Sequence, residues 1–89
     1  MKEIIQSSRF RRDYKLVTKR HLNLNKLREI ITLLASDTQL PARCNPHKLK
    51  RKYYGFWECH IEPDWLLIYK IGVEYIELAA TGTHADLFK

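Results

Sequence analysis

The sequence predicts one small α+β domain in the order β-α-α-β-β-β, with a mostly antiparallel sheet and two helices packed on one face. Apolar residues recur at helical spacing in the first half of the chain, and short apolar runs separated by turn residues follow in the second. The length of 89 residues suits one modest core. We therefore expect a single domain over residues 1–89, without repeats or linkers.

The N-terminal part of the chain predicts a short strand followed by two helices. Residues 2–6 contain two adjacent isoleucines, which favour a strand. Ser7 or Ser8 can cap the first helix and Asn23 the second, because each can accept an unpaired backbone N–H. The helices carry apolar stripes made of Phe10, Tyr14 and Val17 in the first, and of Leu27, Ile30, Ile31 and Leu34 in the second.

The C-terminal half predicts a loop and then a sheet. Residues 36–55 contain two prolines and no apolar periodicity, which is typical of a loop. The middle strand of the sheet is apolar on both faces, as expected of a central strand. We expect the three strands at residues 56–61, 64–71 and 73–80.

Turn residues mark the ends of these strands. Pro63 suits the first corner of a turn because its ring fixes φ. Gly72 is expected to supply the positive φ of a tight hairpin. Residues 81–83 are expected to end the sheet, and residues 84–88 to form a flexible tail that is too short for an independent helix.

The net charge of +6 predicts an anionic partner, either nucleic acid or an acidic protein, although charge of this size also serves solubility. One basic cluster, on the first predicted helix, fits an ordinary solvated face. A second cluster leads into aromatic residues, and this combination binds phosphates and stacks on bases. The first consists of Arg9, Arg11, Arg12, Lys15, Lys19 and Arg20, and the second of Lys48, Lys50, Arg51 and Lys52, followed by Tyr53, Tyr54, Phe56 and Trp57.

The chain shows neither a signal peptide nor an apolar run of membrane-spanning length, so we expect a cytoplasmic protein without a membrane partner. Cys44 and Cys59 are then expected to stay reduced. A zinc site that includes both Cys59 and His60 is disfavoured, because neighbours on a strand face opposite ways. We expect neither a metal nor another cofactor.

The stretch W-E-C-H-I-E-P-D-W, residues 57–65, concentrates groups that can transfer protons. On a strand, Glu58, His60 and Glu62 share one face, and Asp64 follows in the turn. The opposite face is apolar and can enter the core. We therefore expect the hairpin tip to gather these four side chains into a small volume.

Three histidines, His47, His60 and His84, stand at ends of predicted connections, where residues distant in sequence can converge. Histidine titrates near neutral pH and suits proton transfer. Beside a basic, aromatic surface, such a cluster indicates RNA as the substrate. A base would remove the proton of a 2′-hydroxyl, which attacks the adjacent phosphate, and an acid would protonate the leaving 5′-oxygen.

The segments H-I-E-P-D-W-L-L-I-Y-K, T-G-T-H-A-D-L-F and L-P-A-x-x-x-x-H-K-L resemble the YafQ branch of the RelE/ParE superfamily, the toxins of bacterial toxin–antitoxin systems. The resemblance implies a ribosome-dependent mRNA endonuclease that inhibits translation. It also implies a cognate acidic antitoxin that neutralises the toxin in a hetero-oligomer. A ParE-like gyrase inhibitor and an RNA-binding module without catalysis are the alternatives on the same scaffold.

The family's motif carries over to individual residues of this chain. It implies catalytic roles for His47, His60, Asp64 and His84, and RNA contacts for Trp65, Phe88 and the second basic cluster. Glu58 keeps the acidic character of a supporting aspartate. Ala80 departs from the pattern, because relatives carry there an arginine that would clamp the scissile phosphate; we expect Ala80 on the strand face of Leu78.

The roles within this set stay open at this point. Asp64 or a neutral His60 can take the 2′-proton, and a flexible tail can bring His84 to the leaving group as the acid. His47 would hold the phosphate together with Lys48, Lys50 and Arg51. The structural alternatives are that Asp64 caps its turn, Trp65 lies in the core, Phe88 packs the tail and Glu58 pairs with a lysine.

Overall fold

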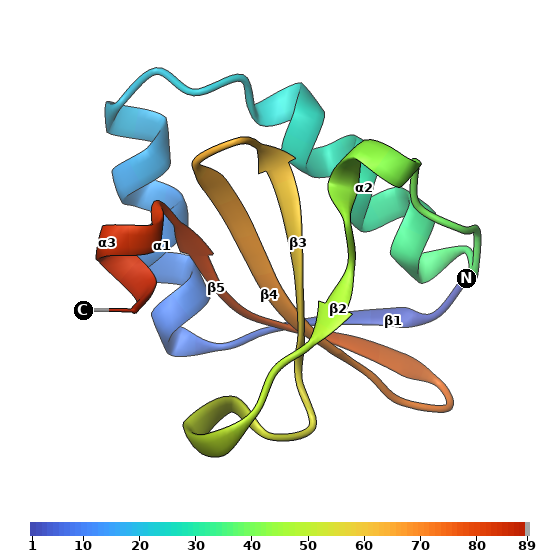
Figure 1. Cartoon of the computed structure of the whole chain (residues 1–89). Coiled ribbons are helices and arrows are strands. Elements are labelled where there is room, and N and C mark those ends of the chain that lie inside the picture. Colours follow the sequence, from blue (N-terminus) through green and yellow to red (C-terminus); the bar gives the residue numbers. More distant parts are fainter. Residues whose placement is uncertain (89) are drawn as a thin grey trace.

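A five-stranded mixed sheet forms the centre of the protein, as shown by a computed structural model that describes residues 1–88 (Figure 1). The strands are β1 (Glu3–Gln6), β2 (His47–Lys48), β3 (Trp57–Glu62), β4 (Trp65–Ile71) and β5 (Tyr75–Gly82). Their order across the sheet is β1-β5-β4-β3-β2, and only β1 and β5 run parallel. The predicted mostly antiparallel sheet is confirmed; residue 89 of the predicted domain lies outside the described residues.

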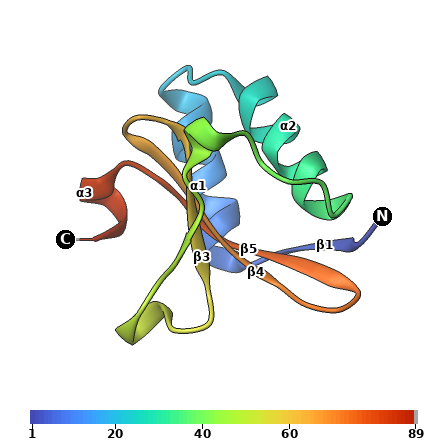
Figure 2. The same ribbon diagram turned by 45° about the vertical axis from the view of Figure 1, so that its right-hand side comes forward.

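Two long helices cover one face of this sheet (Figures 1 and 2). They are α1 (Ser8–Lys19) and α2 (Leu24–Ala35), and both predicted caps are confirmed. The Ser7 side chain accepts a hydrogen bond from the N–H of Phe10, and the Asn23 side chain accepts one from Asn25. No helix within residues 1–88 is long and apolar enough to cross a membrane.

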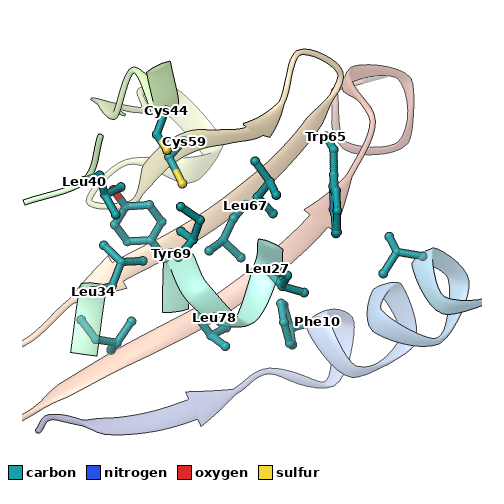
Figure 3. Packing of buried hydrophobic residues seen from close by; sticks show 14 residues of the cluster. Phe10, Leu27, Leu34, Leu40, Cys44, Cys59, Trp65, Leu67, Tyr69 and Leu78 are labelled. Carbon is teal, nitrogen blue, oxygen red and sulfur yellow. The ribbon is translucent and has the colours of Figure 1, made fainter. Parts of the chain in front are cut away.

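The main core lies between these helices and the sheet. Figure 3 shows Phe10 and Leu27 from the helices facing Leu67 and Leu78 from the strands. Trp65 is 2% exposed within the same cluster, and its indole N–H donates to the Thr81 hydroxyl at 2.9 Å. The apolar stripes of both helices are therefore core, as predicted.

The opposite face of the sheet carries a smaller apolar cluster and the polar groups discussed below. Leu66, Ile68, Ala80 and Leu87 form this cluster, and Leu49, Tyr53 and Phe56 pack partly against it. The connection between β2 and β3, rather than a long helix, covers this face. Polar side chains at its margins consequently remain accessible.

The structure corrects the predicted loop and tail. Residues 36–55 contain β2 and two 3₁₀ turns, η1 (Ala42–Cys44) and η2 (Arg51–Tyr53). β5 continues through residues 81–82, and the predicted flexible tail is the short helix α3 (His84–Leu87). A capping box explains α3, because the side chains of Thr83 and Asp86 each accept a hydrogen bond from the other's backbone N–H.

Two turn details also differ from the prediction. The glycines with positive φ are Gly55 and Gly82, not Gly72. Glycine is needed at position 72 for a steric reason, because the ring of Tyr75 occupies the space where a Cβ atom would lie. A bulge in β5 pairs Ile68 with Ala80 but Tyr69 with Leu78, so Ala80 faces away from Leu78, contrary to the prediction.

Candidate active site

Strand pairing sets the frame of the site on the open face of the sheet. His60 lies opposite Leu66, and Glu58 lies opposite Ile68, so both share the face of the smaller apolar cluster. His47 on β2 pairs with Glu58 across the next ladder. Three neighbouring strands thus hold these polar side chains in fixed register.

His84 and Asp64 form one histidine–carboxylate pair. Asp64 Oδ1 lies 2.6 Å from His84 Nδ1 and 2.9 Å from the His84 backbone nitrogen. A carboxylate only accepts, so Nδ1 carries hydrogen and the ring's Nε2 stays available for proton transfer. The backbone and then the side-chain hydrogen bond from His84 hold the pKa of Asp64 below its usual value, which makes Asp64 a poor base. Asp64 therefore orients His84 rather than capping the turn after Pro63.

His60 lies beside this pair. Its ring centroid is 5.7 Å from that of His84, with the ring planes 45° apart. His60 Nδ1 is 3.3 Å from the carbonyl oxygen of Pro63. Because a carbonyl only accepts, Nδ1 donates, and Nε2 of a neutral His60 is left as a proton acceptor. The two rings thus lie next to each other, each with Nδ1 engaged and Nε2 unengaged.

His47 and Glu58 form a second pair with a different character. His47 Nε2 lies 3.2 Å from Glu58 Oε1, and Nδ1 lies 3.0 Å from the carbonyl oxygen of Asn45. Both ring nitrogens face oxygen atoms, so neither is left free for a substrate. Glu58, 6% exposed, is thus paired with His47 and not with a lysine.

The hairpin tip does not gather all four predicted groups. A register shift lies between His60 and Glu62, and Glu62 binds Lys26 on α2 at 2.9 Å. Glu62 therefore faces the helices, whereas Glu58 pairs with His47. Of the four predicted side chains, only His60 and Asp64 lie at the same place, because each of them is next to His84.

Charged residues that the sequence did not single out for this role fix α3 in place. Arg20 binds the Asp86 carboxylate at 2.6 and 3.2 Å, and Arg9 donates to the Asp86 carbonyl oxygen at 3.1 Å. Asp13 accepts from the backbone N–H of Thr81 at 3.0 Å. These arginines were assigned to a solvated helix face. The sequence feature that could have revealed α3 is Thr83-x-x-Asp86, which has the spacing of a capping box.

The second basic cluster lines a cleft next to α3, which we call the basic cleft. The cleft measures about 380 Å³ and is lined by Leu49, Lys50, Arg51, Lys52, Tyr53, Leu87 and Phe88. The rings of Tyr53 and Phe88 meet edge to face with centroids 6.0 Å apart, and Phe88 is 43% exposed. Lys48 lies instead over the Trp57 ring at 5.6 Å. The basic cleft thus offers cations and an accessible aromatic ring.

One predicted RNA-contacting residue, Trp65, and the position of the family's clamping arginine, Ala80, are both buried. Trp65 is buried, so its ring cannot stack on a base, and the expectation of a direct RNA contact is wrong. Ala80 is 1% exposed between Ile68 and Leu87. A longer side chain at position 80 would start from the face that carries His60.

The arrangement of cysteines and histidines bears on the zinc alternative. Cys44 and Cys59 are both fully buried in the main core, and burial raises the pKa of the Cys59 thiol to about 12. His60 lies on the other face of β3. Within residues 1–88, no three His, Cys, Asp or Glu side chains gather as ligands of a metal ion.

The sheet with two helices on one face and paired histidines on the other defines a RelE-like protein. The profile of the YafQ family, bacterial toxins of type II toxin–antitoxin systems, matches residues 2–89. This chain belongs to the YafQ family.

Individual relatives agree with this assignment. An mRNA interferase toxin YafQ of Escherichia coli BL21(DE3) is 43% identical over 88 residues, covering 98% of this chain and 96% of that protein. The crystal structure of YafQ from the same strain superposes with a TM-score of 0.94 at 41% identity, covering 100% of both chains. YafQ in the crystal structure of the E. coli DinJ–YafQ complex gives a TM-score of 0.92, again at 41% identity and 100% coverage of both chains.

Proposed function

We propose that this protein is a cytoplasmic toxin that cleaves mRNA on the ribosome and is neutralised by a cognate acidic antitoxin. The observation that carries the proposal is the pair of His60 and His84 rings, 5.7 Å apart, each with Nδ1 engaged and Nε2 available. The kinship with the mRNA interferase YafQ of E. coli supports the reaction class.

The chemistry needs one base and one acid. Neutral His60 takes the proton of a 2′-hydroxyl, and the 2′-oxygen forms a bond to the adjacent phosphorus. The bond from phosphorus to the 5′-oxygen breaks, and protonated His84 gives that oxygen a proton. The products are a 2′,3′-cyclic phosphate and a 5′-hydroxyl. His60 gains one proton and His84 gives up one, so the number of protons on the site is unchanged, and no oxidation or reduction occurs.

The remaining groups of the site act on charge and position. Asp64 holds His84 in the tautomer that leaves Nε2 free. Cations of the basic cleft stabilise the negative charge that grows on the phosphate, and His47, held by Glu58, helps to position that phosphate. This division of labour involves no metal ion.

Dependence on the ribosome follows from how little of the substrate this site can hold. Both members of the His84–Asp64 pair are more than half exposed, with 53% and 66% of their side chains accessible. An open site orients a flexible strand poorly, and orientation is worth several kcal/mol of the barrier. The ribosome supplies a strand that is already held in place.

The proposed antitoxin rests on charge and kinship. The chain carries a net charge of +6, which suits an acidic partner. The E. coli YafQ has been crystallised with DinJ, an antitoxin. A complex of this chain with its own antitoxin would form the corresponding hetero-oligomer.

The test compares cleavage of one mRNA with and without programmed ribosomes, followed by analysis of the RNA ends. We expect cutting on ribosomes only, with a 2′,3′-cyclic phosphate or 3′-phosphate at one end and a 5′-hydroxyl at the other. Equal cleavage of naked mRNA would refute ribosome dependence. Ends with 3′-hydroxyl and 5′-phosphate would refute the histidine mechanism, and inhibition of gyrase without any cleavage would favour the ParE-like alternative.

A further inference from the structure

A cleft of about 690 Å³ opens beside His60, and the mechanism above does not use it. Its lining residues come from α2, from η1 and the residue after it, and from the tip of the β3–β4 hairpin. We call it the His60 cleft; its lining includes Lys26, Arg43, Asn45, His60, Glu62 and Pro63. Its volume falls within the range of small-ligand sites, about 300–1,000 Å³, and suits one nucleotide.

The charges in the His60 cleft favour an anion. Lys26 and Glu62 form an ion pair at 2.9 Å, so their charges largely offset each other. Arg43 forms neither an ion pair nor a side-chain hydrogen bond with any residue in the range 1–88 that the structure describes. A guanidinium without a protein partner is well suited to bind a phosphate through two parallel hydrogen bonds.

His60 joins this cleft to the reacting groups. Its ring lines the His60 cleft on one side and lies next to the His84 ring on the other. The proposed base therefore stands at the mouth of the His60 cleft, and the proposed acid begins α3. The basic cleft continues from there, because Leu87 and Phe88 at the end of α3 form part of its wall.

The positions of base and acid fix a direction along RNA. The 2′-hydroxyl belongs to the nucleotide on the 5′ side of the scissile phosphate, and the leaving oxygen belongs to the nucleotide on the 3′ side. A base beside the His60 cleft requires the first nucleotide on that side. An acid at α3 requires the second nucleotide near the basic cleft.

We propose that the His60 cleft binds the nucleotide whose 2′-hydroxyl attacks, and that the RNA runs 5′ to 3′ from this cleft, past His84, into the basic cleft. Arg43 binds the phosphate on the 5′ side of that nucleotide, and its base lies against Pro63. Glu62 opposes the bound strand and restrains Lys26. This assignment rests on the proposed function and adds the direction of the strand and the residues that bind its 5′ side.

The first test is single-turnover cleavage on programmed ribosomes. We expect Arg43→Ala to raise about tenfold the concentration of the protein that gives half of the maximal cleavage rate. The maximal rate itself should be nearly unchanged, because Arg43 contacts a non-reacting phosphate. Glu62→Gln should lower that concentration, since it removes a carboxylate from the cleft. Arg11→Ala, the loss of an exposed arginine on α1, is the matched control. An Arg43→Ala variant no weaker than this control would overturn the assignment.

The second test does not require cleavage. The photo-crosslinking residue p-benzoylphenylalanine replaces Glu62 in one variant and Phe88 in another, and the ribosome-bound mRNA carries a 2′-deoxy nucleotide at the cut site. We expect crosslinks from position 62 on the 5′ side of the cut site and from position 88 on the 3′ side. The reverse pattern, or crosslinks to ribosomal RNA alone, would overturn the proposed path. Failure of the wild type to cleave unmodified mRNA would count against the proposed function instead.

Discussion

The two histidine–carboxylate pairs of the site differ in burial and in the use of their ring nitrogens. The Asp64 side chain is 66% exposed, and of the two ring nitrogens of His84 only Nδ1 is engaged, by Asp64. The Glu58 side chain is 8% exposed, and His47 has both nitrogens engaged. A ring with a free nitrogen at the surface can exchange protons with a substrate, whereas a ring held from both sides is fixed in position and has no free nitrogen for proton transfer. We therefore expect the two pairs to respond differently to substitution.

The largest effect is expected from removing the rings that transfer protons. His84→Ala and His60→Ala should each reduce the maximal cleavage rate by about two to four orders of magnitude. Both rings lie outside the main core, so circular dichroism and binding of the antitoxin should be unchanged. Loss of activity together with loss of folding would make these residues structural and would remove the basis of the comparison.

The next effect concerns the orientation of His84. Asp64→Asn should reduce the rate by about ten- to hundredfold, because an amide can donate to Nδ1 and thereby favour the wrong tautomer. The pH–rate profile of the variant should shift as well, since the carboxylate no longer faces the imidazolium. An unchanged profile and rate would show that Asp64 does not control His84.

A smaller effect is expected at the second pair. His47→Gln should reduce the rate by about five- to tenfold, because His47 positions the phosphate and does not transfer a proton. His84→Gln, measured in parallel, should lose far more. Equal losses in the two glutamine variants would abolish the distinction between the pairs.

Ala80 offers a gain rather than a loss. Ala80→Arg should raise the rate by a few fold, since a guanidinium starting from the face of His60 can reach the scissile phosphate. The same change should lower the Tm, because Ala80 is packed between Ile68 and Leu87. Alanine replacements of Arg43, Arg51 and Lys52 provide the comparison. If Ala80→Arg leaves the cleavage rate unchanged and one of these alanine variants loses most of its activity, the cation that binds the scissile phosphate lies in the loop instead.

The smallest effect is on stability as a function of pH. Hydrogen bonds from Arg20 and then Thr83 hold the pKa of Asp86 well below its usual value, so this carboxylate stabilises the folded state above the ordinary pKa of aspartate. That contribution disappears as the pH falls toward the lowered pKa. Asp86→Asn should therefore lower the Tm by a few degrees at neutral pH and by progressively less in acid. A Tm difference that is constant with pH would contradict this linkage.

Regular spacing made most of the fold predictable, and local exceptions limited the rest. The α1 and α2 stripes and the three long strands follow periods that the residues themselves carry. The β5 bulge does not, and it turned Ala80 to the other face. α3 was misread as a tail because a short helix gains its stability from Asp86 and its arginine partners, which lie far away in the sequence.

The candidate site was predictable as a set of residues but not as a set of contacts. Motif and charge indicated His47, His60, Asp64 and His84. Which carboxylate meets which histidine depends on strand register and on the carbonyl oxygens of Asn45 and Pro63, which composition cannot reveal.

The parallel pairing of β1 with β5 has a consequence for synthesis of the toxin. β1 and α1 are synthesised before β5 and α3, although β5 pairs with β1 and packs against α1. Such distant contacts form late in folding. The helix that begins with His84 therefore has no anchored position until β5 has joined the sheet. The paired rings of His60 and His84 consequently come together only once β5 and α3 have been made.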